Sequence, residues 1–190
     1  MKTILIIGAT GSLASYVTKA FLQLNDVQVT LFARNPSNIK QSLAEKCTLI
    51  QGDAMDYNNV KNAVSGKDII YINLAGNLEK MVNNIVRAMI EEGVKKVIAI
   101  SSIGIYRTPL KTVLQPYRAL ADIIEASGLD YTIIRPDWFT NGEEVEYHIT
   151  RKPEPEIGGA LSRRSIADFV AKVVAFPGEY INANVGISKL

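Results

Sequence analysis

The 190-residue sequence has little cysteine and little histidine, with one residue of each, Cys47 and His148. A single cysteine cannot form an intrachain disulfide and offers no set of thiolates for a metal site. A single histidine likewise excludes a cluster of histidine ligands, so we expect no bound metal. The lack of disulfides is typical of proteins in a reducing cytoplasm, which is the compartment we expect.

The sequence also lacks a strong excess of charge and a long hydrophobic run. Its 21 basic residues are scattered among 19 acidic ones, for a net charge of +2, and they do not form the basic stripe of a nucleic-acid-binding surface. The apolar run Ile4–Ile7 ends at Gly8, far short of the roughly 20 residues that span a membrane. We therefore expect neither a nucleic-acid partner nor a membrane partner.

The sequence does contain a repeated alternation of short β-branched runs with stretches of helical periodicity. The expected strands are Thr3–Ile7, Val27–Ala33, Cys47–Gln51, Asp68–Leu74, Lys96–Ser101, Asp130–Arg135 and Val185–Ser188. Apolar residues recur at helical spacing over Leu13–Leu24, Leu78–Met89 and Ile166–Val173. Successive strand–helix–strand units predict an α/β fold, namely a Rossmann-type doubly wound parallel sheet of about seven strands.

The regular alternation stops after Pro136. The stretch from 137 to about 163 contains several prolines and glycines among charged residues, which indicates irregular structure. Within it, the alternation around His148 favours a strand and a structural role for this histidine. Because the length fits one α/β domain, we predict a single domain over 1–190 with a small irregular C-terminal lobe. We expect Cys47 to be buried in the third strand.

The junction between the first strand and the first helix carries a glycine-rich turn. It reads Gly8-Ala9-Thr10-Gly11-Ser12-Leu13-Ala14. Gly8 allows the tight turn, Gly11 lets a pyrophosphate approach the backbone, and Ala14 lets the helix pack close to the sheet. The helix then directs its first N–H groups and its positive dipole end toward such a ligand. This pattern predicts a dinucleotide site that includes Thr10, Ser12 and Leu13; the alternative is a structural turn that binds nothing.

The end of the second strand distinguishes the two nicotinamide cofactors. An NAD(H) site places an acidic residue there for the ribose 2′-hydroxyl, but the sequence reads Leu31-Phe32-Ala33-Arg34-Asn35. A guanidinium at this point pairs with a 2′-phosphate through two parallel hydrogen bonds. Arg34 therefore favours NADP(H) over NAD(H), the alternative being an arginine that is simply solvated.

Small or polar residues close the third and fourth strands, at the edge where open α/β sheets bind ligands. Asp53 and Ala54 follow the third strand, and Asn73, Ala75 and Gly76 follow the fourth. Asp53 either reaches the adenine amino group or is an ordinary turn-forming aspartate. We expect the fourth-strand residues to lie beside the nicotinamide half of the cofactor.

These residues resemble the short-chain dehydrogenase/reductase superfamily, in its atypical branch of NAD(P)H-binding, NmrA-like and flavin or biliverdin reductase-like proteins. The resemblance rests on Gly8–Ala14, Arg34, Gly52-Asp53, Ser101-Ser102, Ser127–Pro136 and Ser165–Asp168, and covers nearly the whole chain. It implies that Ser101 and Pro136 lie beside the cofactor. The substrate pocket that it implies is lined by Ser102, Ile103, Tyr106, Trp138 and Phe139. The two aromatic residues Trp138 and Phe139 then cover a flat substrate, although such a pair is as often simple packing.

The catalytic residues of the superfamily are only partly present. Typical members reduce carbonyls with a Ser, a Tyr, and a Lys four residues after the Tyr that lowers the pKa of the phenol. Ser102 and Tyr117 are candidates for the first two, but position 121 holds alanine. Without a nearby cation, a phenol with its ordinary pKa of about 10 is a poor acid–base catalyst at neutral pH.

Hydride transfer does not always need an acid from the protein. Solvent supplies the proton when a flat conjugated acceptor is held against the nicotinamide. The sequence therefore favours an NADPH-dependent reductase of a flavin, a quinone or a similar small molecule. The alternative is a non-catalytic NmrA-like sensor that binds NADP(H) and acts through a protein partner. A carbonyl or sugar-nucleotide dehydrogenase with a displaced tyrosine ranks third, because only residues 137–190 follow Pro136.

Overall fold

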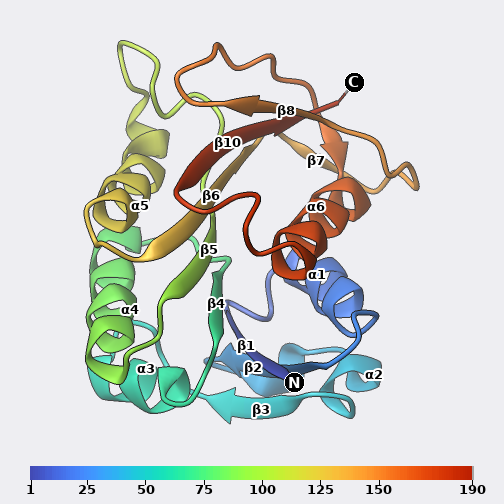
Figure 1. Cartoon of the computed structure of the whole chain (residues 1–190), viewed down its shortest axis with the longest axis vertical. Coiled ribbons are helices and arrows are strands. Elements are labelled where there is room, and N and C mark those ends of the chain that lie inside the picture. Colours follow the sequence, from blue (N-terminus) through green and yellow to red (C-terminus); the bar gives the residue numbers. More distant parts are fainter. Residues whose placement is uncertain (190) are drawn as a thin grey trace.

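A computed structural model describes residues 1–189 and shows one large sheet with helices on both faces (Figure 1). The eight strands of this sheet follow the order β3-β2-β1-β4-β5-β6-β10-β8. They are β1 (Lys2–Ile7), β2 (Val27–Ala33), β3 (Thr48–Gln51), β4 (Ile69–Ile72), β5 (Lys96–Ile100), β6 (Asp130–Pro136), β8 (His148–Arg151) and β10 (Ala183–Ser188).

The sheet confirms the expected Rossmann-type topology. Seven strands pair in parallel, and β8 alone runs antiparallel, beside β10. The chain builds outward from β1 to β3 and then returns to β4 on the other side of β1. The strand order therefore reverses between β1 and β4, which is where open α/β sheets bind their ligands.

Helices cover both faces of the sheet. They are α1 (Ala14–Phe21), α2 (Gln41–Ala44), α3 (Tyr57–Val64), α4 (Leu78–Glu92), α5 (Gln115–Glu125) and α6 (Arg163–Ala175), with short 3-10 turns η1 (Pro36–Asn38) and η2 (Thr112–Leu114). Helices α1 and α6 lie side by side on one face, and α3, α4 and α5 pack on the other (Figure 1). The sequence pattern does not predict α2 and α3, which are short. None of the helices within residues 1–189 is long and apolar enough to cross a membrane.

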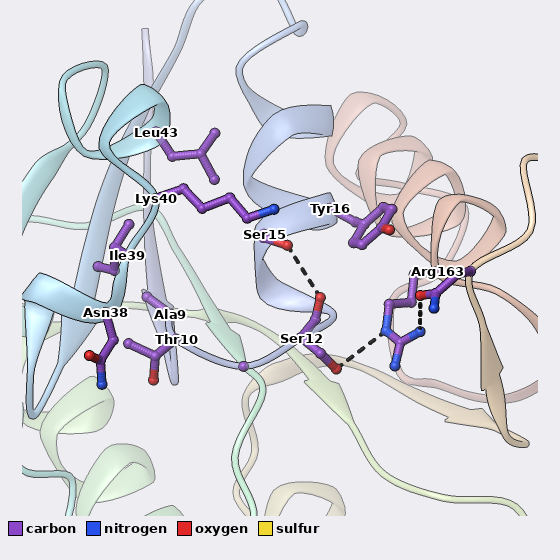
Figure 2. A pocket seen from close by; sticks show the side chains of 12 residues that line it. Ala9, Thr10, Ser12, Ser15, Tyr16, Asn38, Ile39, Lys40, Leu43 and Arg163 are labelled. Atoms are coloured by element: carbon purple, nitrogen blue, oxygen red, sulfur yellow. Dashed lines mark hydrogen bonds between the residues drawn. The ribbon is translucent and has the colours of Figure 1, made fainter.

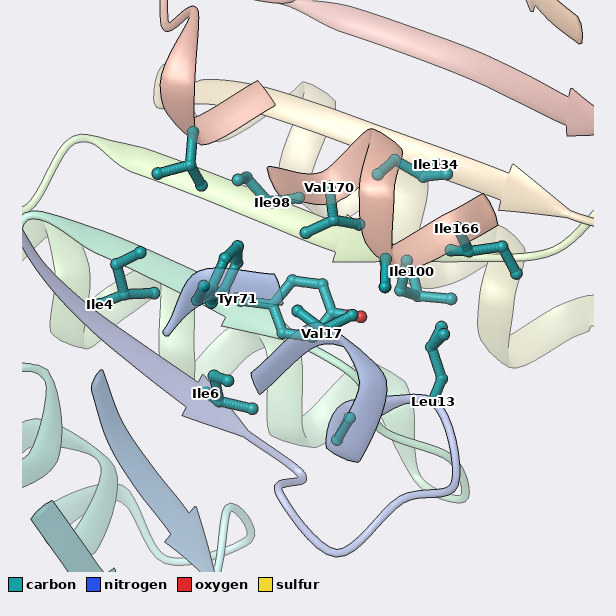
Figure 3. Close-up of a cluster of buried hydrophobic side chains, with 14 of the residues drawn as sticks. Ile4, Ile6, Leu13, Val17, Tyr71, Ile98, Ile100, Ile134, Ile166 and Val170 are labelled. Carbon is teal, nitrogen blue, oxygen red and sulfur yellow. The ribbon is translucent and has the colours of Figure 1, made fainter. Parts of the chain in front are cut away.

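The two faces of the sheet explain why the first strand is apolar throughout. Ile4 and Ile6 point into the core beneath α1 and α6 (Figure 3), whereas Leu5 and Ile7 point into the core beneath α3, α4 and α5. Successive side chains of a strand alternate between faces, so a strand covered on both faces needs an unbroken apolar run. All four of these residues are fully buried.

Two helices end at or near a glycine. Gly93 ends α4 and Gly128 follows α5, and both have positive φ, +72° and +75°. Glycine adopts this left-handed conformation at little cost. At the other end of α4, the Asn77 side chain accepts a hydrogen bond from the backbone N–H of Lys80 at 3.3 Å, which caps the helix.

Cys47 is not in a strand, contrary to expectation. It is half-buried and directly precedes β3. Because β3 lies at the edge of the sheet and has little covering it, three of its four residues are exposed. The sequence thus predicts the strand at this position correctly, but β3 is less buried than expected.

The C-terminal lobe, residues 137–163, is more regular than expected. Strand β7 (Phe139–Thr140) pairs with β9 (Leu161–Ser162) in a separate two-stranded sheet. The strand expected around His148 is confirmed as β8, but it joins the main sheet beside β10, with His148 opposite Ser188. This pairing adds an eighth strand to the seven that the sequence predicts. The sequence does not predict the pairing, because β8 and β10 are far apart along the chain.

Candidate functional site

The glycine turn lies at the carboxyl end of β1, where the strand order reverses. Gly8 has φ +91°, and the N–H of Gly11 donates a 3.0 Å hydrogen bond to the carbonyl of Gly8, which closes the turn. A Cβ added at Gly8 would lie 2.1 Å from the backbone oxygen of Asn73. One added at Gly11 would lie 2.7 Å from Asn73 Nδ2. The backbone of Asn73, directly after β4, thus restricts position 8 to glycine, and its side-chain amide lies close to position 11.

The helix that follows this turn begins without a cap from a side chain. Leu13 occupies the N-cap position of α1, and no side chain in the described chain accepts from the first N–H groups. By contrast, Asp56, Asn77 and Ser162 cap α3, α4 and α6 with side-chain hydrogen bonds. Free N–H groups together with the positive end of the helix dipole attract an anion such as a phosphate.

A pocket of about 310 Å³ opens beside the turn (Figure 2). It is lined by Ala9, Thr10, Gly11, Ser12, Ser15, Tyr16, Asn38, Ile39, Lys40, Leu43, Asn141 and Arg163. The lining thus comes from the glycine turn, from α1, from the segment after β2 and from the lobe. Sequence reasoning missed Tyr16, Lys40 and Arg163. Of these three, only Lys40 could have been found from the sequence, because it is a second cation in the segment that follows Arg34.

Arg34 lies at the end of β2 and is exposed. Its side chain makes no ion pair or hydrogen bond with any residue of the part described, and its backbone oxygen accepts a 3.1 Å bond from Gln51 Nε2. Its positive charge is therefore available to an anionic ligand. At the end of β3, Asp53 Oδ1 accepts from the N–H of Met55 at 2.9 Å, which is the bond of a turn-forming aspartate. The neighbouring Ala54 is buried.

The end of β4 supplies the other wall of the turn. The N–H of Asn73 donates to the carbonyl of Ile7 at 3.0 Å, which holds this residue against the end of β1. Ala75 and Gly76 are exposed in the loop that follows, and Gly76 has φ +100°. The residues expected around a dinucleotide from the first, second and fourth strands therefore lie at one edge of the sheet. A tight glycine turn followed by an uncapped helix fits a pyrophosphate group.

The segment after β5 is fixed to β6. The N–H of Ser101 donates to the carbonyl of Ile134 at 2.8 Å, and the N–H of Ile103 donates to that of Pro136 at 2.9 Å. Ser101 Oγ donates to the carbonyl of Tyr117 at 3.0 Å, whereas Ser102 Oγ donates to the carbonyl of Ile103 at 3.2 Å. Both serine hydroxyls thus hold backbone in place.

The Tyr117 side chain lacks the lysine of the superfamily pattern, because position 121 holds alanine. Tyr117 is half-buried and packs against the core beneath α4 and α5. Ala121, one helical turn later, is fully buried in that same core, so its position has no room for a lysine that reaches the phenol. The nearest cation in sequence, Arg118, is paired with Asp122 at 2.8 Å. The serine–tyrosine–lysine arrangement of carbonyl reductases is therefore not formed in residues 1–189.

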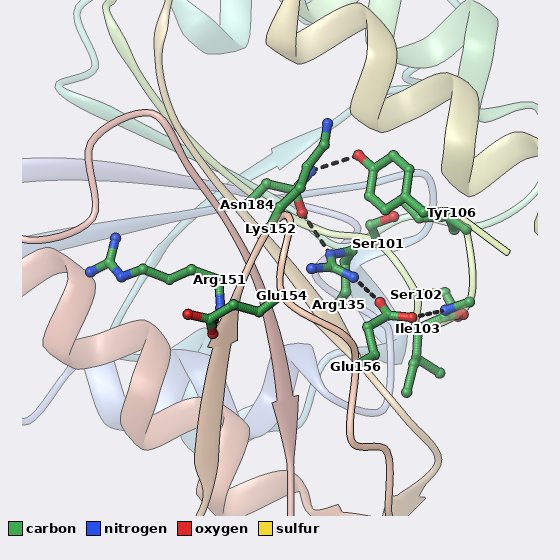
Figure 4. Close-up of polar contacts among 12 residues, drawn as sticks. Ser101, Ser102, Ile103, Tyr106, Arg135, Arg151, Lys152, Glu154, Glu156 and Asn184 are labelled. Carbon is green, nitrogen blue, oxygen red and sulfur yellow. Dashed lines mark hydrogen bonds and ion pairs between the residues drawn. The ribbon is translucent and has the colours of Figure 1, made fainter.

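A buried polar network supports this segment from behind (Figure 4). Arg135, 1% exposed, forms an ion pair with Glu156 and donates from Nε to Asn184 Oδ1 at 2.7 Å. Glu156 Oε2 also accepts from the N–H of Gly104 at 2.8 Å. Asn184 Nδ2 donates to the hydroxyl of Tyr106 at 2.7 Å. Tyr106 therefore points toward β10.

The two aromatic residues after β6 differ in exposure. Trp138 is 82% exposed. Phe139, in β7, is half-buried, and the guanidinium of Arg163 lies 5.4 Å from the centre of its ring. An exposed indole next to the end of a central strand offers a flat apolar surface to a ligand. Residues 1–189 hold no group of three or more His, Cys, Asp or Glu placed to bind a metal.

Comparison with known proteins gives matches along nearly the whole chain. A model of the NAD(P)H-binding family matches residues 8–177. The chain is similar to a Rossmann-fold NAD(P)-binding family protein from Shigella flexneri, at 37% identity over 100% of this chain and 94% of that one, with a TM-score of 0.91. It shares its fold with a short-chain dehydrogenase/reductase from Veillonella parvula DSM 2008 in complex with NADP, at 21% identity over 99% and 94% of the two chains (TM-score 0.90).

A further structure with this fold is ChuY, an anaerobillin reductase from Escherichia coli O157:H7, at 17% identity over 99% of this chain and 97% of that one, with a TM-score of 0.85. The family match begins at Gly8, the first residue of the turn, and ends beyond α6. The chain therefore belongs to the NAD(P)H-binding family.

Proposed function

We propose that this protein is an NADPH-dependent reductase of a flat conjugated acceptor, such as a flavin, a quinone or a similar small molecule, that works in the cytoplasm. One observation carries the proposal: a well-formed nucleotide turn stands next to an acceptor side without a tyrosine–lysine pair. The whole chain acts as one domain, with residues 137–163 forming the acceptor side.

The charges around the turn support NADP(H) over NAD(H). No carboxylate closes β2, and Arg34 stands there without an acidic partner in the described chain. Lys40, from the segment after η1, lines the pocket and extends toward the start of α1 (Figure 2). Two cations on one segment suit the extra phosphate, because a guanidinium binds it in a bidentate manner and an ammonium acts as a point charge.

The acceptor side supports positioning in place of acid–base chemistry. A bound nicotinamide supplies the hydride. The residues of this chain hold the acceptor: Ile103 and Pro136 lie at the ends of β5 and β6, and Trp138 presents an exposed ring beyond them. Because Ala121 leaves the Tyr117 phenol without a cation, the proton comes from solvent. Structures of the same fold include one in complex with NADP and one described as an anaerobillin reductase.

Calorimetric titration with NADPH, NADP⁺, NADH and NAD⁺ tests the cofactor part of the proposal. Wild type should prefer the phosphorylated pair, and Arg34→Ala should weaken that pair about tenfold or more while leaving NADH unchanged. Lys19→Ala, which removes an exposed cation from the last turn of α1, is the matched control. If none of the four nucleotides binds, the turn is structural and the proposal is wrong.

Oxidation of NADPH in the presence of flavins, quinones and linear tetrapyrroles tests the acceptor part. The proposal requires turnover with at least one member of this panel. The missing tyrosine–lysine pair also fits a second function, a sensor that binds NADP(H) and changes its affinity for a protein partner. Binding without turnover, together with a partner captured by only one redox form, would favour the sensor over the reductase.

A further inference from the structure

Helix α6 begins with an arrangement of charge that is unfavourable for a helix. Its first two residues are Arg163 and Arg164, and no acidic residue occupies its first turn. The first turn carries the positive end of the helix dipole, which repels cations. Cations at this position are unfavourable for the helix, so we expect another interaction of these arginines to offset the unfavourable energy.

The two arginines differ in what surrounds them. Arg164 forms an ion pair with Glu143 at 3.3 Å on the exposed surface. Arg163 has no carboxylate partner within residues 1–189. Its Nε donates to Ser12 Oγ at 3.3 Å, and its Nη1 donates to the carbonyl of Thr140 at 3.1 Å and to Asn141 Oδ1 at 2.9 Å. All three acceptors are neutral, so the charge of Arg163 is uncompensated.

Arg163 also lies where an anion is expected. Ser12 belongs to the glycine turn, and its contact with Arg163 brings the first residues of α1 and α6 together at one pocket (Figure 2). The positive ends of both helix dipoles therefore meet there, and α1 has no side-chain cap. Nη2 of Arg163 makes no hydrogen bond with any of the residues described, so the guanidinium has a donor to spare.

We propose that Arg163 binds the pyrophosphate of the dinucleotide, the group that NAD(H) and NADP(H) share. A guanidinium suits a pyrophosphate because its planar donors form charge-assisted hydrogen bonds with phosphate oxygens. This inference rests on the nucleotide binding of the proposed function and is independent of the acceptor.

The same side chain links the nucleotide to the acceptor lobe. Thr140 and Asn141, which Arg163 holds, follow Trp138 by two and three residues. A phosphate bound by this guanidinium holds Thr140, the last residue of β7, and Asn141 in place through the two bonds of Nη1. Binding of the dinucleotide thus orders the start of the acceptor side.

The test compares neutralised variants in calorimetric titrations with NADPH, NADH and ADP-ribose, which contains the pyrophosphate without nicotinamide. Arg163→Gln should weaken all three about tenfold or more, by a similar factor. Arg164→Gln is the matched control, because it removes the same charge from the same helical turn outside the pocket, and it should leave all three affinities within about twofold. Arg163→Lys should recover part of the loss. Thermal melting of each variant verifies that it is folded.

Hydrogen exchange at residues 139–141 gives a second measure. NADPH should slow exchange there in wild type and not in Arg163→Gln. Affinities unchanged in Arg163→Gln overturn the inference, and so does a loss confined to NADPH, which would place Arg163 at the 2′-phosphate. An equal loss in Arg164→Gln would attribute the effect to long-range charge. If wild type binds no nucleotide at all, the proposed function fails as well, whereas each other result leaves it standing.

Discussion

The hydroxyl of Tyr71 offers a direct test of the packing in this fold. Tyr71 lies on β4, in the middle of the sheet, and is fully buried (Figure 3). Its ring packs edge-on against Phe21, with centroids 6.0 Å apart and an interplanar angle of 85°. Its hydroxyl has no hydrogen-bond partner in the described chain, and burial raises the pKa of the phenol.

The replacement Tyr71→Phe should therefore stabilise the protein. Mutational data place the cost of burying a hydroxyl without a partner at roughly 1–3 kcal/mol. Removal of the oxygen leaves a void on the order of 10 Å³, which costs about 0.2 kcal/mol at about 24 cal/mol per Å³. The net gain in the free energy of unfolding is about 0.8–2.8 kcal/mol, or roughly 2–11 °C in Tm for a chain of this size. The edge-on contact with Phe21 is kept, because the ring remains.

Urea denaturation of wild type and variant measures this gain, provided that the m-values agree. Tyr131→Phe removes the same group from a half-buried position that lines an open pocket, and it should change stability by less than about 0.5 kcal/mol. A loss of about 1 kcal/mol or more in Tyr71→Phe would refute the reasoning, because it would mean that the hydroxyl is hydrogen-bonded in solution.

Two further predictions concern charges away from the nucleotide turn. Contacts with Lys61, Tyr57 and Arg87 lower the pKa of the Glu91 carboxyl from its ordinary 4.5 to about 2; this stabilisation is present above pH 4.5 and is lost as pH falls toward 2. Acid denaturation should thus be less steep in this window for Glu91→Gln, and an unchanged slope would contradict it. Glu156→Gln leaves the buried Arg135 without its ion pair, and it should lower the free energy of unfolding, measured by urea denaturation, by about 3 kcal/mol. Glu154→Gln, which changes an exposed side chain, should lower it by less than about 0.5 kcal/mol.

The local structure of β1 and of the glycine turn could be predicted from the sequence. The unbroken apolar run in β1 predicts a strand covered on both faces, and the glycine pattern after it predicts the turn at the switch point of the sheet. The conformation of Gly8, with its positive φ, confirms the tight turn. Such features depend on a few consecutive residues, for which propensity and spacing are sufficient.

The contacts that complete the site were not readable, because they join distant segments. Ser12 and Arg163 are 151 positions apart, and no local pattern pairs them. The same holds for β8, whose existence was expected but whose place beside β10 depends on the whole topology. The sequence shows that alanine replaces the expected lysine at position 121, but only the structure shows that this position is fully buried. Asn73 was expected beside the nicotinamide, and its close contact with Gly11 was not anticipated.

The strand contributed by the lobe also constrains how this protein can diversify. All six residues of β10 are buried, and β8 covers the outer edge of that strand. If β8 were removed, β10 would present a row of unpaired N–H and C=O groups, which is a template for strand pairing between molecules. A loop exchange that alters residues 137–163 without keeping His148–Arg151 should therefore yield a protein that aggregates. New acceptor preferences have to arise in the segments on either side of that strand.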